Sequence, residues 1–533
     1  MKYPIGLQDF EGLIKDGYVY VDKTDLVCRL VNDGKIYFLS RPRRFGKSLL
    51  VSTLKHYFLG HRDLFKGLAI DGLETEWNEY PVFHLSFGGQ IYTNTDELDR
   101  VLEGFVREGE VRYGSVAYNN TLGGRFSAVL KAAHEKTGRR CVVLIDEYDK
   151  PLLDVMDTDL RVTDSDGNSL RLEEYNRNVL KGFYSVFKDA DPDLKFVLLT
   201  GVTKFSQVSV FSGFNQPKDI SMDSRYEALC GITLEEMLEV FHEPITQLAK
   251  ENGVCYEEMV EMLKKRYDGY HFSKKMTGVF NPFSLLNCFD KLELRNYWFA
   301  TGTPTYLMRL LSHSDKNINE LVGKYYEESQ FIDYKADVER PLPMIYQSGY
   351  LTVKGYNERR KKYILDFPNE EVRHGFVSIL ASDYFSSDKT PSSWIDDISD
   401  ALEDGKIEEF MRKMTSLLSS VTYRFQRKQD ALECERYFQY TFYLIMQMIG
   451  HYNTMVEKET SEGRIDCVIE CPEQVYILEF KLNGSAEEAL RQIEEKGYAK
   501  PYATDTRPVH LIGINFTSEK GNIEEYKHHL SAV

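Results

Sequence analysis

The sequence predicts an α/β fold of several domains, and three observations support this prediction. First, an apolar run at 35–40 precedes the loop "RPRRFGKS", and helical apolar spacing follows it over 47–60. Second, four apolar residues at 142–145 run directly into an acidic pair, as expected for a buried parallel strand. Third, two strand-like runs near the C-terminus are followed by a helical pattern over about 485–497. Sheets covered by helices are therefore expected.

Length and composition limit the class of protein. The chain has 533 residues, of which 42% are hydrophobic and 13% aromatic, so it can bury several cores in roughly three or four domains. The longest apolar runs, such as 442–450, are far shorter than the roughly 18 residues of a membrane span. The N-terminus has no apolar signal segment. We therefore expect a soluble, cytoplasmic protein with no membrane partner.

Net charge and cysteine content limit the class of protein and its compartment further. The formal net charge of −17 argues against a chain that coats nucleic acid nonspecifically, because phosphate neutralisation needs clustered Lys and Arg. A locally basic groove is still compatible with that balance. The eight cysteines are scattered without a C-x-x-C pair, which favours small core residues in a reducing compartment over a zinc ribbon.

The loop before the first predicted helix has the second half of a phosphate-binding motif. Gly46, Lys47 and Ser48 fit G-x-x-x-x-G-K-[ST], but Arg41 takes the place of the first glycine. A helix N-terminus offers free N–H groups to an anion, and Gly46 lets the backbone approach it. Lys47 can reach the β and γ phosphates, and Ser48 can ligate magnesium. The alternative is a basic turn followed by a chance helix-capping sequence.

The acidic pair at 146–147 supplies the carboxylates that a nucleotide site needs besides its phosphate loop. Asp146 can hold magnesium, through water or with Ser48, and Glu147 can polarise an attacking water. A third strand, predicted at 195–201, ends near Thr200, whose hydroxyl could sense the γ phosphate. A strand-end threonine that only forms local hydrogen bonds is the alternative for Thr200.

Several stretches together resemble the bacterial AAA-ATPase-like proteins, a P-loop group whose modified Walker A motif carries Arg-Pro-Arg-Arg before Phe-Gly-Lys-Ser. The stretches are "YVDKT" (20–24), "SRPRRFGKSLL" (40–50), "LIDEYDKPL" (144–152), "LLTGVTKFSQVSVFSGFNQPKDIS" (198–221), "YDGYHF" (267–272) and "NPFSLL" (281–286). The resemblance covers roughly residues 1–310 and makes Arg41 the usual residue of the family. It implies a P-loop NTPase parallel sheet that binds ATP and Mg²⁺. The implied nucleotide-binding residues are Arg44, Phe45, Gly46, Lys47, Ser48, Asp146 and Thr200.

The same resemblance implies a P-loop core over 1–230 and a helical lid over 231–310. Within the lid, 233–253 opens with a Thr cap and an acidic first turn before helical apolar spacing. Arg225 is the candidate arginine finger, and an ordinary surface arginine is the alternative.

The middle of the chain, 311–410, predicts a winged-helix module. Apolar and polar residues alternate over 350–356 and 362–367 around a basic turn, and a helix is expected to start near Pro368. Such a turn can contact DNA, or the module can pack as an intramolecular regulator with a solvated turn. The basic residues of the turn are Arg359, Arg360, Lys361 and Lys362.

The C-terminal region contains a second set of chemically active residues. Asp466 stands 13 residues before Glu479, and Lys481 follows two later on the same strand face, giving D-x(12)-E-x-K. Two carboxylates on adjacent strands can hold one or two divalent metals, and a neighbouring lysine can orient water or stabilise developing charge. Alternating charges on a solvated strand are the alternative, but the flanking apolar residues favour buried strands.

This arrangement resembles the PD-(D/E)XK nuclease fold as it occurs at the C-terminus of the same ATPase family. The resemblance covers about 430–515 and implies a restriction-endonuclease-like α/β domain, assigned here to 411–533. The leading Pro-Asp of the family is Ile465-Asp466 in this chain. It also implies roles for three residues on flanking helices, with Glu435 as a further metal ligand. These residues are Glu435, Gln492 and Tyr498.

Two functions from different classes follow. In the first, ATP binding at Lys47 and Asp146 rearranges the lid and winged helix and licenses a Mg²⁺-dependent phosphodiesterase at Asp466, Glu479 and Lys481. Its substrate would be nucleic acid, with DNA favoured over RNA. The second is a nucleotide-switched scaffold whose C-terminal fold binds without cutting. The acidic charge favours the scaffold and the intact D/E/K set favours the nuclease, which we take as the prediction; an oligomer is compatible with both.

Overall fold

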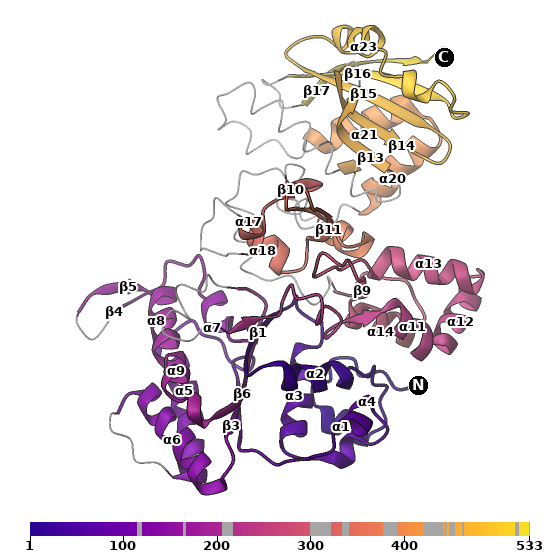
Figure 1. Cartoon of the computed structure of the whole chain (residues 1–533). Coiled ribbons are helices and arrows are strands. Elements are labelled where there is room, and N and C mark those ends of the chain that lie inside the picture. The colour runs from indigo at the N-terminus through magenta and orange to yellow at the C-terminus, as the bar shows by residue number, and fades with distance from the viewer. Residues whose placement is uncertain are drawn as a thin grey trace. The chain divides into compact units, whose positions relative to one another are not determined.

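The computed structural model describes twelve stretches of the chain, which fall into two compact units, Met1–Arg373 and His374–Val533 (Figure 1). The four predicted domains remain a prediction, because a compact unit can hold more than one domain. No helix in the described stretches is long and apolar enough to cross a membrane. These stretches are 1–114, 120–163, 167–204, 217–298, 321–332, 341–376, 392–419, 442, 445–446, 453–460, 463–517 and 522–531.

A five-stranded parallel sheet forms the centre of the first unit, in the order β2-β3-β6-β1-β7. The three apolar runs predicted as strands are confirmed as β1, β3 and β6. Because β6 lies between β1 and β3, the carboxyl ends of all three meet at one edge. The strands are β1 (Ile36–Ser40), β2 (Val82–Ser86), β3 (Cys141–Asp146), β6 (Leu194–Gly201) and β7 (Lys218–Asp219).

Helices cover both faces of this sheet, as predicted for an α/β fold (Figure 1). On one side lie α1 (Phe10–Lys15), α2 (Thr24–Asp33), α3 (Lys47–Phe58) and α4 (Ala69–Leu73). On the other lie α5 (Thr95–Tyr113), α6 (Leu122–Thr137), α8 (Leu172–Tyr184) and α9 (Val186–Asp189). The short elements β4 (Arg161–Thr163), β5 (Ser169–Arg171) and α7 (Lys150–Leu153) connect β3 to α8.

The described part of the predicted helical lid, 231–298, contains four helices packed around their own apolar core. The stretch 233–253 forms two helices, because the chain turns at Phe241 and Pro244 lies in the first turn of the next helix, where proline is tolerated. Thr233 forms the expected cap, and Glu236 in the acidic first turn completes a capping box with it. The elements are α11 (Leu234–Val240), α12 (His242–Glu251), α13 (Tyr256–Tyr267) and α14 (Pro282–Lys291), with β8 (Ile232–Thr233) and β9 (Val279–Phe280).

The predicted hairpin is confirmed in the last part of the first unit. A three-stranded antiparallel sheet has the order β10-β12-β11, and its basic turn at 358–361 joins β11 to β12. We call residues 321–332 and 341–376 the hairpin module. Its elements are β10 (Lys324–Tyr326), α17 (Glu328–Ile332), α18 (Leu342–Gln347), β11 (Thr352–Asn357) and β12 (Lys362–Asp366).

The second unit contains a mixed sheet with the order β13-β14-β15-β16-β17, in which only the β15–β16 pair is parallel among the described strands. That parallel pair needs a crossover, and α23 (Ala486–Glu495) supplies it and packs on the sheet. The other elements are α20 (Ser392–Glu403), α21 (Ile407–Ser419), β13 (Asn453–Thr460), β14 (Gly463–Glu470), β15 (Val475–Leu482), β16 (Val509–Thr517) and β17 (Asn522–Leu530).

Candidate nucleotide site and candidate nuclease site

The phosphate-loop candidate has the backbone shape that its sequence requires. Gly46 is the N-cap residue of α3, with φ of +89°, a conformation that glycine adopts without strain. Arg44 also has a positive φ, of 69°. Because α3 starts at Lys47, the amides of its first turn have no partner within the helix. This is the geometry of an anion-binding helix N-terminus.

The Lys47 side chain is buried beneath this loop. Its Nζ donates hydrogen bonds of 2.9 Å to the backbone oxygens of Arg41 and Pro42. Burial lowers the pKa of Lys47, and the nearby carboxylates of Asp146 and Glu147 oppose that shift. The ammonium is therefore held in a dry environment, where a phosphate would be a strong partner.

Asp146 and Glu147 lie at the end of β3. The Asp146 carboxylate accepts a 2.6 Å hydrogen bond from the Thr200 hydroxyl and a 3.0 Å bond from the Glu147 amide. Glu147 has a positive φ of 53°, and burial followed by the charge of Asp146 raises the pKa of its carboxyl. The Thr200 bond matches the local hydrogen bonding weighed as an alternative, and it also holds Asp146 in place.

Asp149 is a buried carboxylate that sequence reasoning did not single out. One of its oxygens accepts hydrogen bonds from the Val202 amide at 2.9 Å, the Thr203 amide at 2.6 Å and the Thr203 hydroxyl at 2.7 Å. These bonds join the segment after β3 to the segment after β6. The signal was present in "LIDEYDKPL", whose second aspartate was quoted without a role.

A cavity of 430 Å³ lies at this loop and brings most of the predicted residues together. Gly46, Lys47, Ser48, Arg44 and Glu147 line it, together with Asp149 and Lys150. Asp146 and Thr200 are not among the residues that line it. Phe45 is buried against Tyr270 and Phe272, with ring centroids 4.8 and 5.5 Å away, so it supports the loop from its other side.

The remaining walls of the cavity come from two segments distant in sequence. Residues 4–8 form one wall, and Pro282, Phe283 and Leu286 at the start of α14 form another. The Arg44 guanidinium lies 4.8 Å from the centre of the Phe283 ring. The quoted motif "NPFSLL" contains the second wall, whereas nothing in the sequence pointed to residues 4–8.

A hydrogen-bonded network connects the loop, the lid and the hairpin module within the first unit. The Trp298 indole donates to the Arg43 backbone oxygen at 3.2 Å, and the Trp298 amide donates to Glu371 at 2.8 Å. The hydroxyl of Ser284, on α14, donates to the same carboxylate at 2.7 Å. Burial raises the pKa of Glu371 to about 7. Glu371 therefore ties the module to the lid helix that lines the cavity.

Arg225, the candidate arginine finger, lies outside the lining of this cavity. Its guanidinium forms ion pairs with Asp223 at 2.6 Å and Asp33 at 3.3 Å, and its side chain is half-exposed. These ion pairs are those of an ordinary surface arginine. Arg225 does not line the described nucleotide cavity.

The second unit places the D-x(12)-E-x-K residues on neighbouring strands. Cys467 of β14 lies opposite Leu478 of β15, so Asp466 and Glu479 occupy the next position of the antiparallel pair. The Phe480 amide donates to Asp466 at 2.8 Å, whereas the Phe480 ring packs on the other face against Phe516. The predicted alternation of side chains along β15 is confirmed.

Gln492 connects the charged residues of this site. Lys481 Nζ donates to the Gln492 side-chain oxygen at 2.6 Å and lies 3.9 Å from Glu479 Oε1, while the Gln492 amide donates to Glu479. Tyr498, whose pKa burial raises, donates to the Arg464 backbone oxygen at 2.9 Å. The α23 crossover thus brings Gln492 to the Glu479 carboxylate, whereas Tyr498 follows the helix and bonds to the β14 backbone. Glu435 lies outside the described residues.

The donors at this site suit a hard cation. Asp466 and Glu479 offer carboxylate oxygens, which Mg²⁺ prefers. In the described stretches, no group of three or more His, Cys, Asp or Glu residues is arranged to hold a metal ion. The described residues therefore fit a Mg²⁺ ion that would be held by two carboxylates and would keep several of its waters.

Comparison with known proteins finds one family model in each of the two units. A family model described as predicted AAA-ATPase matches residues 4–211, and one described as PD-(D/E)XK nuclease superfamily matches 433–526. The uncharacterized protein in the vnfD 5′ region of Azotobacter chroococcum mcd 1 is 33% identical over 532 residues, which is 98% of each chain. The chain belongs to this AAA-ATPase-like family. The resemblance inferred from the motifs is confirmed, including the C-terminal nuclease superfamily domain.

Among solved structures, the AAA-ATPase-like chain matches that of the Aeropyrum pernix ORC1 protein in complex with DNA. The match has 10% identity and covers 69% of this chain and 97% of that one, with a TM-score of 0.25. A score this low adds no structural or functional weight. The α/β fold class, with a parallel P-loop sheet and a C-terminal nuclease-like sheet, is supported by the family matches and the strand order.

Proposed function

We propose that this protein is an ATP-binding P-loop ATPase coupled to a Mg²⁺-dependent nuclease that cuts nucleic acid, with DNA favoured over RNA. The observation that carries the proposal is the contact set of Lys481, which touches both Glu479 and Gln492 beside Asp466. A half-buried lysine held between a buried carboxylate and a positioned amide is unusual on a strand without a function.

In the nucleotide site, the chain would bind the triphosphate through the helix N-terminus at Gly46 and the Lys47 ammonium. Ser48 and Asp146 would hold Mg²⁺, which neutralises phosphate charge. Glu147 would orient the attacking water, and burial raises the pKa of its carboxyl, which makes it a stronger base than an exposed glutamate.

In the nuclease site, Asp466 and Glu479 would hold Mg²⁺, which supplies charge stabilisation at a phosphodiester. Lys481 would donate to the oxygen on which charge develops, or orient the attacking water. Gln492 fixes both Lys481 and Glu479 through its two amide atoms. This arrangement reduces the reorganisation that the reaction requires.

A nucleotide-switched scaffold that binds without cutting is the second candidate. The net charge of −17 favours it, and so does the presence of two rather than three metal-binding carboxylates among the described residues. In this alternative Lys481 would serve only to stabilise the strand pair.

The deciding experiment is a cleavage assay on the purified chain. Linear, circular and single-stranded DNA and RNA are incubated with Mg²⁺ or Mn²⁺, with and without ATP. Lys481→Ala should lower cleavage about 100-fold or more, because it removes a donor to the developing charge. Lys496→Ala, an exposed lysine just after α23, is the matched control and should cleave normally.

The nucleotide half is tested in the same assay and by ATP titration. Lys47→Ala should weaken ATP binding about 10- to 100-fold, because it removes a charge-assisted hydrogen bond, and should abolish any effect of ATP on cleavage. Lys55→Ala, on the same helix but outside the cavity lining, is its control. ATP binding without cleavage of any substrate in either metal would instead establish the scaffold.

A further inference from the structure

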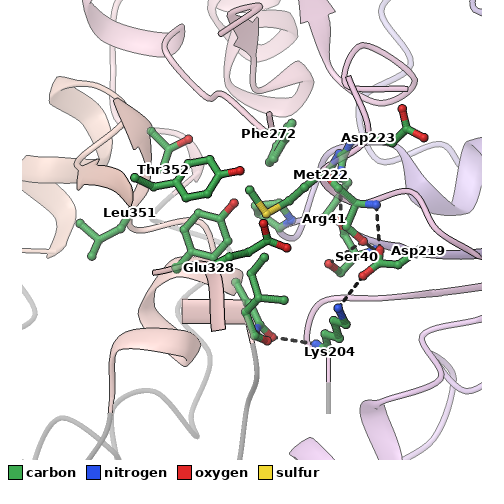
Figure 2. Close-up of a pocket in the computed structure, with 16 residues that line it drawn as sticks. Ser40, Arg41, Lys204, Asp219, Met222, Asp223, Phe272, Glu328, Leu351 and Thr352 are labelled. Atoms are coloured by element: carbon green, nitrogen blue, oxygen red, sulfur yellow. Dashed lines mark hydrogen bonds and ion pairs between the residues drawn. The ribbon is translucent and has the colours of Figure 1, made fainter. Parts of the chain in front are cut away.

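A second cavity, of 420 Å³, lies in the first unit at the other side of the phosphate loop. It is bounded by the end of β1, the segment after β7, and the hairpin module (Figure 2). The predicted nucleotide chemistry does not use it, because Lys47, Ser48 and Glu147 line the first cavity and not this one. Its volume falls in the range of small-molecule pockets.

Arg41 gives this cavity a buried positive charge. Its guanidinium donates to the backbone oxygens of Ser40, Ser221 and Tyr226 and lies 4.0 Å from the centre of the Phe272 ring. Its Nε has no hydrogen-bond partner, and among the described residues no carboxylate forms an ion pair with it. The carboxylates of Asp219 and Glu227 act on this charge only from beyond ion-pair distance. A buried guanidinium without a contacting counter-ion is costly, so an anion is the ligand that this position favours.

The other charges of the cavity leave one carboxylate without a cation. Lys204 pairs with Asp219 at 2.7 Å, and Asp223 pairs with Arg225 at 2.6 Å. Glu328 is exposed and forms no ion pair with any described cation, although its carboxylate accepts a hydrogen bond from the Tyr363 hydroxyl. Figure 2 shows Glu328 projecting into the cavity between Phe272 and Lys204. A carboxylate only accepts hydrogen bonds, so Glu328 favours a ligand with N–H donors.

Aromatic rings supply the remaining specificity. Phe272, Tyr346 and Tyr363 line the cavity, and burial raises the pKa of both tyrosines, so they remain neutral at physiological pH. Flat rings of this kind stack on planar ligand groups. The cavity therefore combines a cation, a hydrogen-bond acceptor and stacking surfaces.

We propose that this cavity binds a small organic anion that carries a planar ring with N–H donors. Nucleoside monophosphates offer a phosphate and a base with N–H donors, and tryptophan, a zwitterion, offers a carboxylate, an indole N–H and an ammonium group. The anionic group pairs with Arg41, the ring packs against Phe272 and Tyr346, and a ring N–H or amine donates to Glu328. This second site is separate from the triphosphate cavity.

Arg41 lines only the second cavity, but it is hydrogen-bonded to Lys47, which lines the first. The Arg41 backbone oxygen accepts the 2.9 Å hydrogen bond from Lys47, while the Arg41 side chain lines the second cavity. A ligand that shifts Arg41 changes the position of an acceptor that competes with phosphate for Lys47. Ligand binding in one cavity therefore changes affinity in the other, and the effect is reciprocal.

The test is calorimetric titration of the full chain after its first site is saturated with a non-hydrolysable ATP analogue and Mg²⁺. The probes are AMP, GMP, CMP, UMP, tryptophan and, as a ring-free control, inorganic phosphate. Glu328→Gln should weaken binding of the preferred probe about tenfold or more, because a charge-assisted hydrogen bond is replaced by a neutral one. Glu327→Gln is the matched control, because Glu327 is exposed and pairs with Lys362 at 3.7 Å.

The outcomes separate the two ligand sources. Binding of a mononucleotide that Glu328→Gln weakens and Glu327→Gln does not supports the proposal and assigns a nucleotide ligand; the same pattern with tryptophan assigns an amino acid. Arg41→Gln, checked for a native circular dichroism spectrum, should lose binding as well. The proposal is overturned if no probe binds, if inorganic phosphate binds as tightly as the ring-bearing probes, or if Glu328→Gln binds like the wild type.

Discussion

The two candidate sites are built in opposite ways. In the first unit, the backbone provides the site: Gly46 and Glu147 have positive φ angles, and the Lys47 ammonium is held by two loop carbonyl oxygens. In the second unit, ordinary strand backbone presents Glu479 and Lys481, and side chains fix one another. The comparison shows that a loop site depends on its scaffold, whereas a strand site depends on its neighbouring side chains.

The lysines of the two sites also differ in how deeply they are buried. Lys47 is 7% exposed, and burial lowers the pKa of its ammonium. The Lys481 side chain is 30% exposed and is held by a carboxylate and an amide. We expect substitutions in the first site to change stability and binding together, and substitutions in the second to change chemistry alone.

The largest effect in this comparison is expected from Asp149→Ala. The substitution leaves the amides of Val202 and Thr203 and the Thr203 hydroxyl without their buried acceptor, at a cost of about 4 kcal/mol in the free energy of unfolding. Urea denaturation of the full chain measures it. Asp159→Ala, at an exposed position, should stay within about 0.5 kcal/mol of wild type. A loss below 1 kcal/mol for Asp149→Ala would show that the loop does not depend on this scaffold.

The next effect is a pH dependence that Glu371 imposes on the first unit. Its pKa is about 7 in the folded chain and 4.5 in the unfolded one, so the folded state binds more protons between these values. Its stabilising contribution is full below pH 4.5 and is lost as pH rises to about 7, a change of about 3 kcal/mol. Glu371→Gln should flatten this part of the stability profile, which urea denaturation at several pH values measures. An unchanged slope would contradict the assignment.

A smaller effect is expected from Gln492→Ala in the second unit. The substitution frees Lys481 and Glu479 without removing either, so cleavage should fall about tenfold while the unfolding free energy changes by less than about 1 kcal/mol. Gln492→Glu distinguishes positioning from packing, because it fills the same volume but cannot donate to Glu479. Normal cleavage by both variants would remove Gln492 from the site.

The sequence predicts contiguous features well. The strand before the loop, the loop itself and the acidic strand are each one short segment, and the structure places them as β1, the α3 N-terminus and β3. The D-x(12)-E-x-K spacing also predicted that Asp466 and Glu479 lie on adjacent strands, because an antiparallel hairpin fixes which strand positions are opposite.

Features assembled from distant segments escaped prediction. Residues 4–8 and the start of α14 meet at the nucleotide cavity only because the lid folds against the core, and no local pattern encodes that approach. The break at Phe241 was missed because apolar spacing continues through it. Glu371 and Trp298, 73 positions apart, interact through backbone amide and carboxylate, which sequence composition cannot reveal.

Trp298 also gives the protein a built-in optical reporter. Its indole donates to the Arg43 backbone oxygen in the phosphate loop and packs at a tilt against the Tyr350 ring of the hairpin module, with ring centroids 5.1 Å apart. The chain has three tryptophans, so replacing Trp77 and the tryptophan at position 394 with phenylalanine leaves a single emitter at the loop. The emission of that indole would follow loop movement directly, in real time and without any attached dye.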